Sequence, residues 1–417
     1  MERNIVTTAD GVSVVRMKNW TRRDLLRSGV GTAAAGLLFT DRSLAAPAPA
    51  TRKAAIIGHT GAGDYGHGIE RIFAGLQGIA VVAVADPHDA GRAKARAACG
   101  AARDYADYRE MLDKEKPDLV GIGPRWAGGH HAMAMAALKA GAHLYLEKPF
   151  TLSLAEADDI LRFAKEKERR VAVAHVARCA PSVLRLEKAL RDGIIGDVLE
   201  IHTVGKMGAR SGGQDMMVLG LHVFDLARLF AGEVQWCHAR IRHKGRVPAV
   251  ADASESPTDR VGPVLGDDIF AQFAMASGMN VTFRSRVGLE KVAGPFGMEI
   301  IGSRGAMRLN SGPVPTLSIL AAPNRAATTR TENWVDWTGG VEPSAEAQID
   351  GITGYDAAHR RVVRDWLAAS DEKREPLASG ERAMKAIEMA HGVFQSGLEG
   401  RRIDFPLARR SHPLIPA

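Results

Sequence analysis

Residues 54–86 read AAIIGHTGAGDYGHGIERIFAGLQGIAVVAVAD, and this stretch decides the fold. The apolar run at 54–57 is typical of a strand buried on both faces. A glycine-rich segment at 58–68 follows, then a helical pattern over about 69–76 and a second strand pattern at 79–85 that ends at an aspartate. Strand, glycine turn, helix, strand and terminal acid in this order indicate a dinucleotide-binding unit.

The glycine-rich segment predicts where the pyrophosphate of the dinucleotide binds. Glycines let the backbone approach the phosphates, and the following helix N-terminus would supply N–H donors and a partial positive charge. The glycine pattern begins three residues beyond the strand instead of at its end, so the loop is longer than standard. Asp86 would accept hydrogen bonds from the ribose hydroxyls and repel a 2′-phosphate, which favours NAD over NADP. The predicted cofactor-binding glycines are Gly58, Gly61, Gly63 and Gly66.

Helix and strand patterns continue to alternate after this unit. The strand at 143–146 delivers Glu147, Lys148 and Pro149 at its carboxyl end. Ligands of open parallel sheets bind outside the carboxyl ends of the strands, so Glu147 and Lys148 are expected to face the cofactor. The remaining patterns of this region predict helices at 108–115, 130–140 and 153–168, and strands at 119–122 and 171–174.

Four motifs together resemble the Gfo/Idh/MocA oxidoreductases. They are the turn around Gly61, the strand that ends in Asp86, the phrase AGAHLYLEKP at 140–149 and the phrase GLHVFD at 220–225. The resemblance covers nearly everything after residue 51, and Glu-Lys-Pro is its most specific element. It implies an α/β Rossmann domain followed by an α+β domain with an open, mostly antiparallel sheet. The outer face of such a sheet usually makes a dimer contact, so a homodimer or homotetramer is expected.

The expected domains are 51–175 for NAD binding and 176–417 for substrate binding and oligomerisation. Long polar connections at 207–215 and 245–266 are of the kind that carries function. Two helices are predicted from Ala357 through Leu398, separated at 371–376. The strands predicted for the second domain are Val198–Thr203, Trp236–Ile241, Ile269–Met275, Met279–Arg286, Met298–Ile301 and Ala306–Leu309.

The resemblance also implies roles for individual side chains. Lys148 would hydrogen-bond the substrate hydroxyl that becomes a carbonyl, and relay its proton. The positive nicotinamide would lower the pKa of this amine, which suits acid–base catalysis near neutral pH. His222 would accept the proton or bind a substrate hydroxyl. Glu147 would orient Lys148 or contact the nicotinamide ribose, and His130 matches a cofactor-site histidine of the family.

The chain departs from the family pattern four residues before His222, where Val218 replaces the usual aspartate. A member of the proton relay is therefore missing or relocated, and the candidates in the neighbouring loop are Asp215 and Lys206. Arg178 could contact the substrate or form an interdomain salt bridge, and the sequence leaves both open. No spacing of histidines and carboxylates predicts a metal site.

Composition excludes several other classes of protein. The 417 residues are 46% hydrophobic and 25% charged, as in ordinary globular proteins. The aromatic content of 6% and the absence of dense Lys/Arg runs argue against nucleic-acid binding. The three cysteines are far apart, which indicates buried free thiols rather than disulfides.

Residues 1–50 resemble a twin-arginine signal peptide. Arg22 and Arg23 precede a mildly apolar segment at 28–40, and small residues follow at 43–50. The apolar segment is shorter than the roughly 20 residues that span a membrane. We therefore expect a periplasmic or extracellular protein without a membrane anchor after signal removal.

Export constrains the function, because free NAD is scarce outside the cytoplasm. Retention of the cofactor would need nanomolar affinity, roughly −12 kcal/mol, and a trapped cofactor must return to its starting redox state in each turnover. The leading interpretation is an NAD-dependent oxidoreductase that acts on a sugar or sugar derivative. The alternatives are an NAD-dependent glycosidase that oxidises, eliminates and reduces, and a non-catalytic binding relative.

Overall fold

The structure is a computed structural model with two compact units, Met1–Pro49 and Ala50–Ala417. It describes residues 5–7, 13–15, 51–208, 210–256, 259–289, 296–320 and 334–416. In the first unit, strands β1 (Ile5–Thr7) and β2 (Ser13–Val15) pair antiparallel. The paired arginines and apolar segment of the predicted signal peptide lie outside the described residues.

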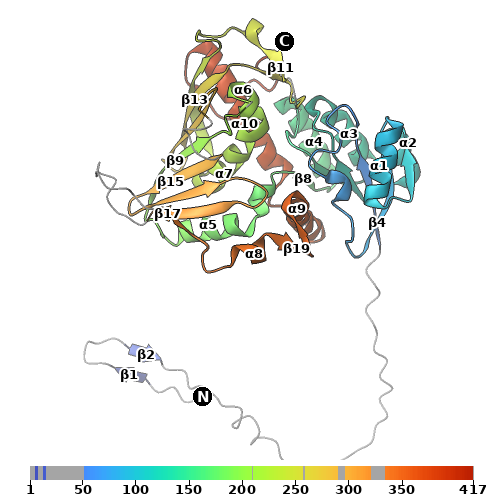
Figure 1. The fold of residues 1–417 in the computed structure, drawn as a ribbon, viewed down its shortest axis with the longest axis horizontal. Helices are drawn as coiled ribbons and strands as arrows, with labels where there is room; N and C mark the ends of the chain where they lie inside the picture. Colours follow the sequence, from blue (N-terminus) through green and yellow to red (C-terminus); the bar gives the residue numbers. More distant parts are fainter. Residues whose placement is uncertain are drawn as a thin grey trace, which may run out of the picture. The chain divides into compact units, whose positions relative to one another are not determined.

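The second unit begins with a six-stranded, fully parallel sheet in the order β5-β4-β3-β6-β7-β8 (Figure 1). This order confirms the predicted Rossmann topology, and its topological switch point lies between β3 and β6. The strands are β3 (Arg52–Ile57), β4 (Ile79–Ala85), β5 (Arg103–Tyr105), β6 (Leu119–Ile122), β7 (His143–Leu146) and β8 (Val171–Val173).

Alternate residues of these strands pack on opposite faces of the sheet. One face is covered by α2 (Tyr108–Glu115), α3 (Ala127–Lys139) and α4 (Leu154–Glu166). A capping box between Ser153 and Glu156 fixes the start of α4. The other face is covered by α1 (Asp89–Cys99) and by α9 (Gly354–Asp371), whose Trp366 is fully buried there. A segment far along the chain thus completes the core of the parallel-sheet domain.

The helix predicted after the glycine loop does not form as an α-helix. Only a single 3₁₀ turn, η1 (Ile69–Arg71), is present, with further turns up to Leu76. Glycines with positive φ at positions 66, 68 and 75 break the helical backbone on both sides of this turn. The expected helix N-terminus beside the glycine loop is therefore missing, and this part of the prediction is wrong.

The second sheet has nine strands in the order β18-β17-β16-β15-β9-β14-β13-β10-β21. Its pairs are antiparallel except for β9 and β14, and all six strands predicted for this domain are confirmed. Helices α7 (Leu221–Ala231) and α10 (Gly380–Glu399) pack on one face. The strands are β9 (Val198–Val204), β10 (Val234–Arg242), β13 (Asp268–Met275), β14 (Asn280–Arg286), β15 (Gly297–Gly302), β16 (Ala306–Asn310), β17 (Thr316–Leu320), β18 (Val335–Asp336) and β21 (Ile403–Asp404).

Short elements connect the two sheets and form the smaller hairpins. A π-helical turn, η3 (Met216–Gly220), leads directly into α7 and carries the Val218 carbonyl toward the first domain. The other elements are η2 (Val176–Cys179), α5 (Pro181–Arg191), α6 (Gly212–Asp215), η4 (Val250–Asp252), β11 (Ser254–Glu255), β12 (Pro263–Val264), α8 (Pro343–Glu346), β19 (Gln348–Ile349) and β20 (Ile352–Thr353).

Candidate active site

Lys148 follows strand β7, and its amine is buried between the two sheets. The side chain is 4% exposed, and Nζ donates a hydrogen bond of 2.8 Å to the carbonyl oxygen of Val218. Burial lowers the pKa of Lys148, whereas the charge of Glu147 opposes that change. An amine whose pKa is lowered in this way can both accept and donate a proton in catalysis.

Glu147 is fully buried and holds two partners. Its Oε1 lies 2.5 Å from Nδ1 of His67, and its Oε2 accepts a 2.6 Å hydrogen bond from the backbone N–H of Lys148. Burial by itself would raise the pKa of Glu147. The hydrogen bond and charge of His67, together with Lys148, hold that pKa below its ordinary value. Glu147 is therefore a buried carboxylate that links the ring of His67 to the backbone of Lys148.

His222 lies at the start of α7, where its ring meets that of His175 edge-on at a centroid distance of 5.3 Å. Neither ring nitrogen of His175 has a hydrogen-bond partner among the residues that the structure describes. Burial lowers the pKa of both histidines, and the charge of Lys148 lowers it further. Both rings are thus held neutral, and the nitrogens of His175 are placed to bind a ligand. We call His67, Glu147, Lys148, His175 and His222 the Lys148 cluster.

Asp215 and Lys206 were the expected replacements for the missing acid at position 218. Asp215 is fully buried, and its carboxylate accepts hydrogen bonds from the backbone N–H groups of Lys206 and Met207 and from Ser285 Oγ. The Lys206 side chain is exposed. Asp215 therefore anchors the loop at 205–208. Within the described residues, the recorded partner of the Lys148 amine is the Val218 carbonyl, and neither Asp215 nor the Lys206 side chain is bonded to it.

Arg178 forms a buried ion pair with Asp225. Its Nε lies 2.8 Å from Asp225 Oδ2, and its second guanidinium nitrogen lies 2.8 Å from Oδ1. The two residues are 4% and 1% exposed, so the pair is screened from solvent. Of the two alternatives for Arg178, the structure shows the salt bridge, between η2 and α7.

His130 is fully buried, and both of its ring nitrogens face backbone carbonyls. Nδ1 lies 2.9 Å from Pro149 O, and Nε2 lies 2.6 Å from Pro124 O. The ring thus ties the loop after β6 to the loop after β7. This placement differs from the cofactor contact that the sequence predicted, because no ring nitrogen remains for a ligand.

The glycine loop packs on the strand ends of its own domain. The carbonyl oxygen of Gly63 accepts a 3.2 Å hydrogen bond from the N–H of Arg125, which follows β6. A Cβ at Gly63 would lie 2.3 Å from that nitrogen, and one at Gly66 would lie 2.4 Å from Glu147 Cγ. A Cβ at Gly58 would meet the ring of Tyr65, whereas Gly61 has open space around it. At three of the four glycines, a Cβ atom would therefore clash with other atoms of the protein.

Asp86 accepts hydrogen bonds from a residue of this loop. Its carboxylate accepts hydrogen bonds from the N–H and hydroxyl of Thr60 and from the N–H of His88, and it is 1% exposed. The predicted contact with ribose hydroxyls would have to replace the Thr60 hydroxyl. The local sequence could not reveal this competition, because Thr60 is brought to Asp86 by the three extra residues of the loop.

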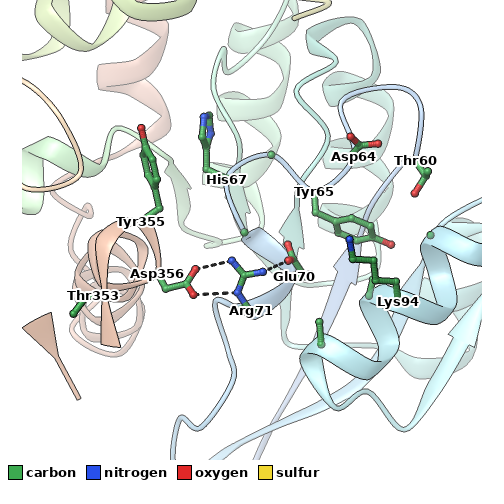
Figure 2. Close-up of a pocket in the computed structure, with 15 residues that line it drawn as sticks. Thr60, Asp64, Tyr65, His67, Glu70, Arg71, Lys94, Thr353, Tyr355 and Asp356 are labelled. Carbon is green, nitrogen blue, oxygen red and sulfur yellow. Dashed lines mark hydrogen bonds and ion pairs between the residues drawn. The ribbon is translucent and has the colours of Figure 1, made fainter. Parts of the chain in front are cut away.

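Two cavities lie beside the glycine-rich segment at 58–68. A cavity of about 820 Å³ is lined by the glycine loop, α1 and the start of α9, and Figure 2 shows His67 and Tyr355 side by side at its edge. A second cavity of about 350 Å³ lies at the carboxyl ends of β3 and β4, lined by Gly58, Asp86 and Trp126 among others. Both volumes lie in the range of small-molecule sites.

These features fit the two ends of an NAD molecule. The 350 Å³ cavity offers an apolar slot next to Asp86 for the adenosine, and the Lys148 cluster supplies unpaired imidazole nitrogens for the reacting end. Between them, the contact of Gly63 with Arg125 crosses the switch point of the sheet. A pyrophosphate placed there requires this contact to open.

An alanine pair tests the contact between the glycine loop and Arg125. Gly61 and Gly63 both have positive φ, 83° and 91°, but only Gly63 faces protein atoms. We expect Gly61→Ala to cost about 1–2 kcal/mol of unfolding free energy from the backbone alone. Gly63→Ala should cost about 1–3 kcal/mol more, because the Arg125 backbone must move. Denaturant unfolding of both variants measures the difference, and equal losses would show that the loop does not rest on Arg125.

Within the described part of the chain, no group of three or more His, Cys, Asp or Glu side chains is arranged to hold a metal ion. No helix among the same residues has the length and apolar character needed to cross a membrane.

Family models match most of the chain. The model described as oxidoreductase family, NAD-binding Rossmann fold, matches residues 52–175. The model described as oxidoreductase family, C-terminal alpha/beta domain, matches residues 187–405.

Three individual proteins are similar to this chain, at 19% to 26% sequence identity. A D-apiose dehydrogenase of Paraburkholderia graminis is 26% identical over 363 residues, which cover 82% of this chain and 87% of that protein. A glycosyl hydrolase family 109 protein of Shewanella sp. strain ANA-3 is 26% identical over 208 residues, 44% of this chain and 45% of that protein. A levoglucosan dehydrogenase solved with NADH and levoglucosan superposes with a TM-score of 0.67 at 19% identity, covering 85% of this chain and 99% of that one. At this identity the structural likeness shows the fold alone.

Proposed function

The chain belongs to the Gfo/Idh/MocA family of oxidoreductases, and from that premise we propose that it oxidises a sugar or sugar derivative with a tightly held, internally recycled NAD. The family and its NAD-binding Rossmann domain account for the cofactor. The class of substrate is supported by the similarity to a D-apiose dehydrogenase over most of both chains. The observation that carries the proposal is the buried amine of Lys148, with its lowered pKa, at the end of a central parallel strand.

Each residue of the cluster has a separate role in the oxidation of an alcohol. NAD, when bound, accepts the hydride from the carbinol carbon. Lys148 hydrogen-bonds the reacting hydroxyl in place of the Val218 carbonyl, and stabilises the oxygen as its proton leaves. His175 and His222 bind neighbouring hydroxyls through their neutral ring nitrogens. Burial of Glu147, Lys148 and His175 excludes water from this part of the site, which strengthens each of these interactions.

Export and retention of the cofactor form the second part of the proposal. The twin-arginine-like segment within residues 1–50 supports a periplasmic or extracellular location. In such a place NAD is kept only if it binds tightly, so oxidation of one sugar is coupled to reduction of another. The open face of the nine-stranded sheet is the proposed contact of a homodimer or homotetramer.

A second candidate function is an NAD-dependent glycosidase. The match to a family 109 glycosyl hydrolase favours it, but this match covers less than half of each chain. Oxidation, elimination and reduction at one site would also return the cofactor to its starting state. The two functions are distinguished by their products, since only the glycosidase releases a new reducing end from a glycoside without a second sugar.

Cofactor content tests the retention directly. We expect the purified protein to keep close to one NAD(H) per chain after size exclusion, because the proposed cycle uses a nucleotide that does not dissociate between turnovers. Denaturation of the protein followed by enzymatic assay of the released nucleotide measures this quantity. A protein that is empty after purification from its natural compartment would contradict retention and would favour a binding relative without turnover.

A further inference from the structure

We propose that His67 is a catalytic residue of the oxidation, the proton acceptor that replaces the acid missing at position 218. The inference rests on the proposed function, because it assigns a proton path to that reaction. His67 comes from the glycine loop, 80 residues before Glu147 in the sequence, and nothing in its local pattern predicted a role in catalysis.

The contact with Glu147 fixes the His67 ring in one chemical form. An ionised carboxylate only accepts hydrogen bonds, so the hydrogen of this 2.5 Å contact sits on Nδ1. Glu147 is fully buried, and its other oxygen is bound to the N–H of Lys148, so it has little freedom to turn away. Nε2 of His67 is consequently left with a lone pair, as in other carboxylate–histidine pairs that act as general bases.

The three histidines of the Lys148 cluster face different charged groups. A positive charge on His175 or His222 would be buried next to the Lys148 amine, and the pKa of both is lowered. A positive charge on His67 would instead face the buried carboxylate of Glu147. In the cavity beside the ring, Arg71 is paired with Glu70 and Asp356 (Figure 2).

His67 is also accessible to a substrate. Its side chain is 31% exposed, and it lines the 820 Å³ cavity together with Tyr355. The two rings lie at a centroid distance of 5.0 Å and an interplanar angle of 32°. Figure 2 shows both rings projecting in the same direction, away from the Arg71 ion pairs. A sugar ring that packs on Tyr355 would thus bring a hydroxyl to Nε2 of His67.

Oxidation of the alcohol removes one hydride and one proton, and each has its own acceptor. A bound NAD⁺ would accept the hydride from the carbinol carbon, and the hydroxyl proton would move to Nε2 of His67. The C–O bond becomes a carbonyl, and Lys148 remains hydrogen-bonded to its oxygen. In the reductive half of the cycle His67 returns the proton as the hydride goes back to a carbonyl carbon.

Three variants test the role of His67. We expect His67→Ala to lose about 10²–10⁴-fold in the rate of hydride transfer, with unfolding and nucleotide content close to wild type. Added imidazole should restore part of this rate, because the truncated side chain opens directly on the 820 Å³ cavity. His67→Gln can still donate a hydrogen bond to Glu147 but cannot take a proton, so it should remain as slow as His67→Ala. The control is His131→Ala on α3, whose ring pairs with the half-exposed Asp159 and lines neither cavity, so this variant should leave the rate unchanged.

A second readout does not depend on turnover. The ¹⁵N shifts of the His67 ring should show a protonated Nδ1 and an unprotonated Nε2. The opposite tautomer, full activity of His67→Gln, or an inactive His67→Ala that imidazole does not rescue would each overturn the role in proton transfer. Absence of sugar oxidation in the wild type would instead overturn the proposed function itself, whatever the state of His67.

Discussion

Lys148→Ala is expected to slow hydride transfer by about 10²–10⁴-fold. The amine is the group that would hydrogen-bond the reacting oxygen, and its present partner, the Val218 carbonyl, cannot replace it. Stopped-flow measurement of the absorbance of bound NADH after sugar is added gives the rate of the chemical step directly. Nucleotide content should stay close to wild type, since Lys148 lies at the reacting end of the cofactor rather than at the adenosine cavity.

The control for this experiment is Lys206→Ala. Lys206 is an exposed lysine of the neighbouring loop, and its backbone rather than its side chain is bound by Asp215. Its loss should change the rate by less than about twofold, because a solvated surface side chain contributes little to a buried site. Equal rates for wild type and Lys148→Ala would refute the catalytic assignment of Lys148.

The second large effect concerns stability. Arg178→Ala should lower the free energy of unfolding by about 3–5 kcal/mol, because it leaves the Asp225 carboxylate buried without its partner. Chemical denaturation monitored by circular dichroism measures the loss. The exposed pair of Lys114 and Glu110 gives a control, since Lys114→Ala should cost no more than about 1 kcal/mol.

The same variant decides between the two roles that the sequence left open for Arg178. A structural ion pair predicts lower stability, with KM for the sugar unchanged in the folded fraction. A raised KM with normal stability would show instead that Arg178 binds substrate.

Regular elements were predictable because their signals are local. The apolar runs at 54–57 and 79–85 became β3 and β4, and the alternating patterns after residue 198 became strands of the second sheet. The Glu-Lys-Pro motif was placed correctly at the end of β7, because strand direction alone decides which end carries it.

Long-range contacts were not predictable from single stretches. The pairing of His67 with Glu147 depends on the path of an extended glycine loop, and the packing of α9 on the parallel sheet joins segments about 300 residues apart, as Arg71 and Asp356 show with a separation of 285. His130 kept its predicted place on a helix, but three carbonyls brought together by tertiary structure use both of its nitrogens. Packing of the glycine loop on Arg125 likewise replaced the predicted helix N-terminus.

A crystal structure of the purified protein with NADH tests the central claim most directly. The account predicts adenosine in the cavity beside Asp86 and Trp126, separation of Gly63 from Arg125, and the nicotinamide ring next to Lys148. A structure obtained at saturating NADH in which residues 59–66 still lie across the strand ends, with Lys148 bound to Val218 and no nucleotide above β3 and β6, would contradict it.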